Sequence, residues 1–205
     1  MQNVRLRILG DLQLEGCGTA QLGRRQVRTM LKILALGHGR PVALDRLVDC
    51  LWDGKPPTRP AEQISVLASR LRGVLGADRV LHSDAGYMLI LDWLDLDALR
   101  EYLAEADRRL AAEKPAAART VATAGLSLIR GPLLADEPDA WWAESERSAV
   151  DLLISRLNQI TEFRRAYEPD GMQPAEFLTY GATQRTLSQF IESGWAQIES
   201  LQFTL

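Results

Sequence analysis

The chain has 205 residues, of which 46% are hydrophobic and 25% are charged, and its formal net charge is −3. This composition is typical of a globular protein rather than a disordered one, and the length suits two compact domains. No apolar run approaches the roughly 20 residues that span a bilayer, and the N-terminus lacks the apolar core of a signal peptide, so we expect a cytoplasmic protein with no membrane partner.

The charges are distributed unevenly along the chain. Residues 1–90 contain 13 Lys and Arg against 8 Asp and Glu, whereas the remaining residues contain 11 against 19. A basic first part followed by an acidic second part suits a nucleic-acid-binding domain joined to a domain that contacts proteins. Charge alone is equally consistent with chance variation between solvated surfaces.

The first residues predict a β-hairpin followed by two helices. Across residues 4–15 apolar and polar side chains alternate around a turn at Gly10-Asp11, which is typical of two half-buried strands. From Arg24 to Gly37 the apolar period lengthens to about 3.6 residues, which predicts a helix. A shorter helix over residues 44–52 ends before two prolines, because proline disfavours a helical residue before it.

The stretch from Pro60 to Gly76 predicts a third helix and holds the best candidate for a functional surface. Pro60 suits the first helical position, because an N–H there has no hydrogen-bond partner within the helix. We expect Gly76, just past the end, to adopt the left-handed conformation. The side opposite the apolar stripe is small and polar with arginines at its edge: Gln63, Val66, Ser69, Arg70, Arg72 and Gly73. Such a surface fits a DNA major groove, where an arginine can donate two hydrogen bonds to a guanine edge. The alternative is a solvated face with two incidental arginines.

A second β-hairpin is predicted directly after this helix. Residues 79–90 contain two strands around a tip at residues 82–85. We expect Gly86 to supply an unusual backbone angle and Tyr87 to pack its ring on the domain. A hairpin after a groove-binding helix is a wing, so the first part is predicted to be an α+β winged-helix DNA-binding domain over residues 1–91.

The apolar pattern of residues 92–205 predicts helices only. We expect a linker at residues 92–97 that leads into a helix capped by Asp95, whose core-facing seam is Leu96, Leu99, Leu103, Ala106 and Leu110. The apolar pattern of residues 116–130 predicts an antiparallel partner helix. The two helices together would make one helical hairpin of the tetratricopeptide (TPR) type. Residues 92–205 are therefore predicted to be an all-α, TPR-like domain.

A long helix is predicted from Pro138 to about Tyr167, and its start contains Trp141 and Trp142. These tryptophans either pack to lock the two halves of the chain together, which is the favoured interpretation, or form an exposed anchor for another protein. Two further helices are expected after Pro174. The last one either caps the bundle with its polar face or binds another chain through its apolar face.

No residue pattern indicates an active site. His38 and His82 lie outside any Ser/His/Asp or metal-ligand pattern, and the sequence has no glycine-rich phosphate loop. We expect Cys17 and Cys50 to be free thiols and the pair Asp136-Glu137 to be solvated. The expectation is a protein without catalysis, cofactor or metal.

The chain resembles the OmpR-type winged-helix domain of the SARP group of bacterial transcriptional activators in three stretches, GRPVALDRLVDCLWDGKPP, VLASRLRGVLG and DRVLHSDAGYMLI. A fourth stretch, LSLIRGPLLADEPDAWWAESERSAVDLL, resembles the bacterial transcriptional activator domain that follows it in that group. The resemblance covers residues 4–165. It implies an N-terminal sheet of three or four strands and three helices, with the third helix in the major groove and the hairpin against the backbone or minor groove.

The resemblance also implies a function. Such proteins bind direct repeats in double-stranded DNA near promoters, self-associate side by side on DNA and recruit RNA polymerase holoenzyme. The implied DNA contacts are Gln63, Val66, Ser69, Arg70 and Arg72 on the helix and His82 and Ser83 on the hairpin.

Two departures from the family pattern reduce the implied phosphate contacts. Asp84 stands near the tip, where relatives often have arginine, and Glu62 and Ser65 occupy helix positions that are often basic in relatives. Fewer phosphate contacts would lower both the affinity for DNA and its dependence on salt. The alternative function is therefore a protein-interaction module that regulates a partner with weak or no DNA binding of its own.

Overall fold

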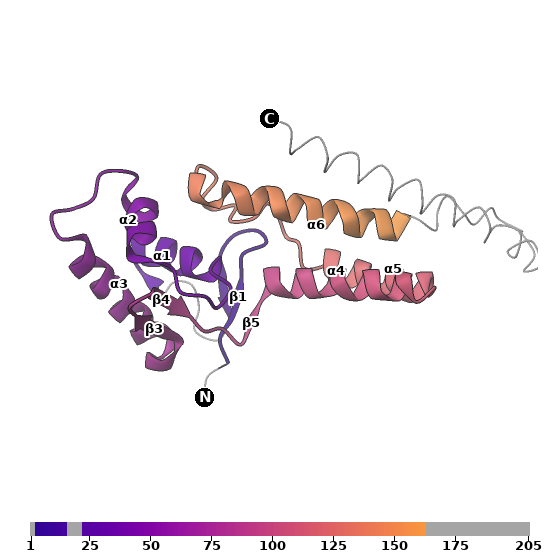
Figure 1. Cartoon of the computed structure of the whole chain (residues 1–205), viewed down its shortest axis with the longest axis horizontal. Coiled ribbons are helices and arrows are strands. Elements are labelled where there is room, and N and C mark those ends of the chain that lie inside the picture. The colour runs from indigo at the N-terminus through magenta and orange to yellow at the C-terminus, as the bar shows by residue number, and fades with distance from the viewer. Residues whose placement is uncertain (1–2, 16–21, 163–205) are drawn as a thin grey trace, which may run out of the picture. The chain divides into compact units, whose positions relative to one another are not determined.

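The structure is a computed structural model that describes residues 3–15 and 22–162 (Figure 1). In chain order the elements are β1 (Arg5–Arg7), β2 (Gln13–Glu15), α1 (Arg25–Ala35), α2 (Leu44–Trp52), α3 (Pro60–Leu75), β3 (Val80–Ser83), β4 (Gly86–Leu89), β5 (Trp93–Leu94), α4 (Asp95–Ala111), α5 (Pro115–Leu126) and α6 (Glu144–Glu162). Short 3₁₀ turns precede β3 and α6, at Ala77–Arg79 and Trp141–Ala143. Cys17, the helix end near Tyr167 and the two helices expected after Pro174 lie outside the described residues.

The N-terminal sheet has the strand order β2-β1-β5. β1 pairs antiparallel with β2, with Arg5 opposite Glu15, which confirms the first hairpin. β1 also pairs in parallel with β5, with Arg5 opposite Trp93. The predicted linker at residues 92–97 is therefore wrong, because this stretch supplies a strand and the start of α4. Backbone hydrogen bonding to β1 continues at Asp92, whose N–H donates to the Val4 carbonyl at 3.0 Å.

The three helices of the first part lie where the apolar periods predict them. The predicted apolar stripe of α3 faces α1 and α2, where Val74 is half-buried and the other members are buried: Ile64, Leu67, Ala68, Leu71 and Leu75. Gly76 has a positive φ of 108°, but its ψ of 148° is not left-handed helical, so the predicted left-handed cap is wrong. The chain continues from Gly76 directly into the 3₁₀ turn at Ala77–Arg79. The left-handed cap occurs instead after α2, at Asp53, with φ 46° and ψ 54°.

The second hairpin is fixed to the chain before α2. β3 and β4 pair antiparallel with Ser83 opposite Gly86, and Tyr87 exchanges two backbone hydrogen bonds with Val42, at 2.7 and 3.0 Å. Gly86 has a φ of 121°, and a Cβ there would lie 2.0 Å from the Val42 carbonyl oxygen. The prediction that Gly86 supplies an unusual backbone angle is confirmed, since any other residue would separate the hairpin from Val42.

The second part contains α4, α5 and α6, which pack against one another (Figure 1). α4 and α5 form the predicted helical hairpin, and the seam of α4 buries Leu96, Leu99 and Ala106. α6 begins at Glu144, so the predicted start at Pro138 is wrong. Residues 127–140, which we name the α5–α6 connection, instead use their backbone to contact the N-terminal hairpin.

The α5–α6 connection runs along the turn between β1 and β2. The N–H groups of Arg130, Leu134 and Ala135 donate to the carbonyls of residues 9, 8 and 10, at 3.0, 2.9 and 3.1 Å. Leu133 and Leu134 are buried there. The two parts of the chain are thus joined through backbone hydrogen bonds and a shared core, and residues 1–162 group as one compact unit. A domain boundary between residues 91 and 92 stays a prediction.

Asp95 reinforces this junction from the start of α4. Its side chain is fully buried, and its carboxylate accepts hydrogen bonds from the N–H groups of Ile8 and Leu9, both at 2.9 Å. Burial raises the pKa of Asp95, while the two backbone donors act in the opposite direction. The prediction that Asp95 caps α4 is wrong: the cap position belongs to Leu94, and Asp95 is the first helical residue.

Replacement of this carboxylate tests the junction. Asp95→Ala leaves two buried N–H groups without their acceptor, and we expect the free energy of unfolding to fall by about 2–4 kcal/mol. Urea unfolding at neutral pH, followed by circular dichroism, measures the change. Asp151→Ala on the exposed surface of α6 is the control, with an expected change within about 0.5 kcal/mol. Equal stability of the two variants would contradict the role given to Asp95.

Candidate nucleic-acid interface

The outward face of α3 is a continuous exposed surface. Gln63, Ser69, Arg70 and Gly73 are exposed, and Val66 has 52% of its surface exposed although it is a large apolar residue. They share this face because the apolar residues of α3 occupy the opposite side, against α1 and α2. The structure therefore brings together four of the predicted contact residues, Gln63, Val66, Ser69 and Arg70, while their role in DNA contact stays a prediction.

Arg72, another predicted contact, has a different environment. It is half-buried, and its Nε donates a hydrogen bond of 2.8 Å to the Val80 carbonyl at the start of β3. The side chain thereby ties the last turn of α3 to the second hairpin. This bond indicates that Arg72 positions the hairpin relative to the helix.

The tip of the second hairpin carries the remaining predicted contacts. His82 and Ser83 are exposed at the end of β3, and the His82 ring stacks on Tyr87 with 4.4 Å between ring centroids. Tyr87 is buried, so it provides a fixed support for the imidazole. Asp84 lies in the two-residue turn and is exposed, which puts a negative charge at the tip.

One exposed cation near this surface, Arg59, was not among the DNA contacts expected from the sequence. Arg59 directly precedes α3, its side chain is 74% exposed, and it lies 3.3 Å from Glu62. Ion pairs between exposed side chains are weak, so Arg59 is available to a phosphate at the cost of little stability. The sequence signal that could have identified Arg59 as a candidate contact is its position directly before Pro60, the first residue of the helix.

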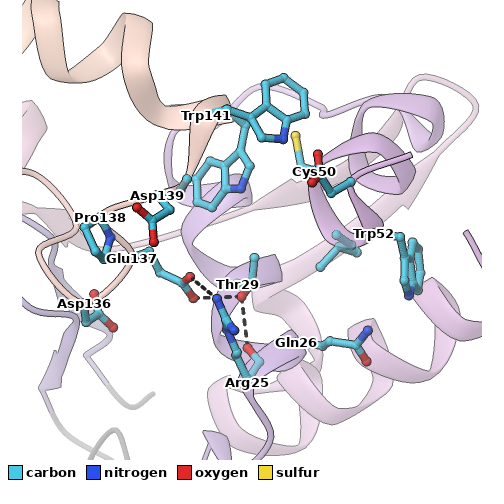
Figure 2. A pocket seen from close by; sticks show the side chains of 14 residues that line it. Arg25, Gln26, Thr29, Cys50, Trp52, Asp136, Glu137, Pro138, Asp139 and Trp141 are labelled. Carbon is cyan, nitrogen blue, oxygen red and sulfur yellow. Dashed lines mark hydrogen bonds and ion pairs between the residues drawn. The ribbon is translucent and has the colours of Figure 1, made fainter. Parts of the chain in front are cut away.

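A second group of charges lies between α1 and the α5–α6 connection. Lys32 is only 1% exposed, and its Nζ lies 2.6 Å from the Asp136 carboxylate and 3.5 Å from that of Glu137. Glu137 also accepts hydrogen bonds from Arg25 at 3.0 Å and Thr29 at 3.1 Å, as Figure 2 shows. The prediction that Asp136-Glu137 is solvated is wrong for Glu137, which is buried because these donors compensate its charge.

The pKa of Glu137 reflects this pairing. Burial alone would raise the pKa, but the hydrogen bond from Arg25, the charge of Lys32 and the hydrogen bond from Thr29 together hold it below the ordinary value of 4.5. The carboxylate is thus ionised near neutral pH and contributes to the contact between α1 and the connection.

The two adjacent tryptophans contact α2. The Arg46 guanidinium lies 5.3 Å from the centroid of the Trp141 ring, and Arg46 donates a hydrogen bond of 3.4 Å to the Trp142 carbonyl. Trp141 remains 49% exposed, whereas Trp142 is half-buried. Trp142 packs against the core, as the favoured interpretation expects, whereas the Trp141 ring is largely exposed, so that interpretation is wrong for Trp141.

The remaining chemistry of the described residues is limited. Within residues 3–15 and 22–162, no three His, Cys, Asp or Glu side chains are grouped so that they could hold a metal ion. Cys50 is a buried free thiol, and burial raises its pKa. None of the helices that the structure describes is both long enough and apolar enough to cross a membrane.

Comparison with known protein families identifies the helical part. Residues 94–168 match the bacterial transcriptional activator domain. The match begins within β5 and covers α4, α5, the connection and α6.

Two relatives are similar over most of the chain. Regulatory protein AfsR of Streptomyces griseus is 31% identical over 151 residues, which is 72% of this chain and 15% of that protein. Transcriptional regulator RedD of Streptomyces coelicolor is 31% identical over 174 residues, which is 75% of this chain and 49% of that protein. The chain thus spans less than half the length of either relative.

A solved structure shares the fold. Mycobacterium tuberculosis EmbR in complex with low affinity phosphopeptide has a TM-score of 0.73 at 24% sequence identity, over 78% of this chain and 45% of that one. Together with the element order, this likeness fits a mixed helix-and-strand part, with three helices and a hairpin, followed by a helical part.

The bond between Arg72 and Val80 can be tested by hydrogen exchange. In Arg72→Ala the hairpin loses one tether to α3, and we expect faster exchange of backbone amides in β3 and β4 with unchanged exchange in α1. The expected loss of overall stability is about 0.5–1.5 kcal/mol. Arg70→Ala, an exposed neighbour, is the matched control and should leave the hairpin amides unchanged. A uniform effect on all amides would contradict a positioning role for Arg72.

The buried carboxylate of Glu137 predicts a dependence of stability on pH. Because its folded pKa lies below 4.5, its ionised form stabilises the fold above that pH, and this contribution is lost as the pH falls through the folded pKa. We therefore expect wild type to be more stable than Glu137→Gln at pH 7, with the difference shrinking as the pH falls below the ordinary value of 4.5. Urea unfolding of both proteins across this range measures the difference. A difference independent of pH would exclude this role.

Proposed function

This chain belongs to the SARP-type bacterial transcriptional regulators, and we propose that it is a sequence-specific DNA-binding activator. The observation that carries the proposal is the open face of α3, where Arg70 stands beside small side chains at the end of a helix–helix–helix–hairpin order. In this proposal residues 1–91 are an OmpR-like winged-helix domain, and residues 92–205 are a shortened, TPR-like transcriptional activator domain.

Each residue on the face of α3 has a distinct proposed role. Arg70 donates two hydrogen bonds to the O6 and N7 atoms of a guanine, Gln63 pairs with an adenine edge, and Val66 contacts a thymine methyl group. Ser69 allows close approach and bonds either type of base. An exposed valine costs little in such a groove, because the thymine methyl group shields it from water.

The hairpin is proposed to contact the DNA backbone or minor groove. His82 and Ser83 are the proposed donors, and the stacking of His82 on Tyr87 reduces the entropy that the imidazole would lose on binding. Arg72 supports this contact indirectly, since it ties β3 to α3. Arg59 is an additional proposed phosphate contact at the start of α3.

The proposed partners are double-stranded DNA, a second copy of the chain on an adjacent direct repeat, and RNA polymerase holoenzyme. The names of the relatives, a regulatory protein and a transcriptional regulator, support a role in transcription. Action on DNA in a bacterium places the proposed function in the cytoplasm. No catalytic activity forms part of the proposal.

Two exposed carboxylates favour a second function, a protein-interaction module with weak or no DNA binding. Asp84 lies exposed in the hairpin turn, and Glu62 lies beside Arg59 at the start of α3. Both carboxylates would repel DNA phosphates.

Selection from a random duplex library separates the two functions. We expect repeated rounds of gel-shift selection with the full chain in about 50 mM salt, where phosphate contacts are strongest, to enrich a direct repeat. Absence of any enriched sequence under these conditions would reject the DNA-binding proposal in favour of the interaction module.

The enriched duplex then allows a test of Arg70. Arg70→Ala should reduce discrimination at one guanine position by about 1–3 kcal/mol, because the variant cannot form the two hydrogen bonds to that base. Binding to the duplex and to its single-base variants, measured by fluorescence anisotropy, gives this value. Arg119→Ala, an exposed arginine on α5, is the matched control and should keep full discrimination. Unchanged discrimination in Arg70→Ala would remove Arg70 from base readout.

A further inference from the structure

A groove of about 510 Å³ lies between the first part of the chain and the α5–α6 connection. Its walls come from three places: the start of α1, the end of α2, and residues 136–142 (Figure 2). The face of α3 takes no part in it. The proposed DNA contacts therefore leave the function of this groove unassigned.

Three of the residues that line the groove are tryptophans. Trp52 at the end of α2 and the pair Trp141 and Trp142 all line it. Figure 2 shows the Trp141 label near those of residues 137–139, and Trp52 on α2 at the right of the view. Partly exposed tryptophans are typical of the few residues that dominate protein–protein binding energy.

The charge of the groove is negative. Its lining includes four carboxylates, those of Asp53, Asp136, Glu137 and Asp139, and one cationic side chain, Arg25. Glu137 is paired with Arg25 and Lys32, and Asp136 is paired with Lys32. Asp53 and Asp139 are exposed, and they form no ion pair with any residue that the structure describes.

Carboxylates next to aromatic rings favour a cation. A guanidinium or ammonium group gains from the charge of the carboxylate and from the negative face of an indole ring. The chain itself supplies an example at the edge of this site, since the Arg46 guanidinium lies 5.3 Å from the centroid of the Trp141 ring. Nucleic acid is a poor occupant, because Asp53 and Asp139 would repel its phosphates.

We propose that this groove binds a segment of a partner protein that presents an arginine or lysine side chain, with Trp141 and Trp52 as its apolar contacts and Asp53 and Asp139 as its ionic contacts. The surface is separate from the face of α3, so the chain can hold DNA and this segment together. The inference does not rest on DNA binding, since it stands on the groove alone.

Panning of a random peptide display library against the full chain tests the proposal. We expect enriched peptides to share an arginine or lysine next to an apolar residue. Synthetic peptides of the enriched sequences, titrated while tryptophan fluorescence is recorded, then give dissociation constants. The double variant Asp53→Asn/Asp139→Asn should weaken binding by about tenfold or more, because both ionic contacts are lost.

The variants are chosen so that the fold is retained. Asn tolerates the left-handed backbone of Asp53, where φ is 46°, and Asp139 is exposed. Asp151→Asn, an exposed residue on α6, is the matched control with an expected change below about twofold. The double variant should also keep its affinity for the selected DNA duplex, which separates failure of this proposal from failure of the DNA-binding proposal.

Four outcomes would overturn the proposal. The first is enrichment of no sequence, or of one without a basic residue, and the second is equal binding to wild type and the double variant. The third is binding of arginine amide alone as tightly as a peptide, which would indicate a site for a small cation. The fourth is a dimer in analytical ultracentrifugation that the double variant abolishes, which would assign the groove to a second copy of this chain.

Discussion

The buried carboxylate of Asp95 is the interaction on which the arrangement of the two parts depends. It belongs to the first residue of α4 and accepts hydrogen bonds from Ile8 and Leu9, so the helical part is attached directly to the N-terminal hairpin. A buried carboxylate must have such partners, because an uncompensated charge in the core is strongly destabilising. The same condition applies on α1, where buried Lys32 and Glu137 compensate one another. Removal of either Lys32 or Glu137 would leave the other charge buried with less compensation, which is strongly destabilising.

The junction determines what remains available for binding. Because the α5–α6 connection covers the turn between β1 and β2 and one end of α1, α3 and the second hairpin keep their outward surfaces. The bond from Arg72 to Val80 and the close approach of Gly86 to Val42 then hold the hairpin to α3 and to the chain before α2. A fixed helix and hairpin lose little conformational entropy on binding, which favours recognition of a rigid duplex. The acidic groove on another surface leaves room for a protein partner at the same time.

The sequence predicts those elements whose signals are local. The three helices of the first part, the helical hairpin of α4 and α5 and the turn at Gly86 follow from apolar periods and from proline and glycine positions. The outward face of α3 follows from the same period, so four of the seven DNA contacts expected from the sequence share one exposed surface. What the sequence did not predict depends on contacts between distant residues. Asp95 with Ile8, and Lys32 with Glu137, are separated by 87 and about 105 residues, and no local pattern indicates such pairs. The start of α6 was misplaced for the same reason, because backbone bonding to the N-terminal hairpin keeps the connection out of the helix.

The central claim is that the chain binds duplex DNA through the outward face of α3 and the tip of the second hairpin. Titration of the ¹⁵N-labelled chain with a selected duplex, followed by NMR chemical-shift mapping, tests this claim most directly. The account predicts that the largest shifts fall on residues 63–72 and on His82 and Ser83, with small shifts in α5 and α6. Shifts concentrated on the α5–α6 connection or on α5 and α6, or no shifts at all at low salt, would contradict it.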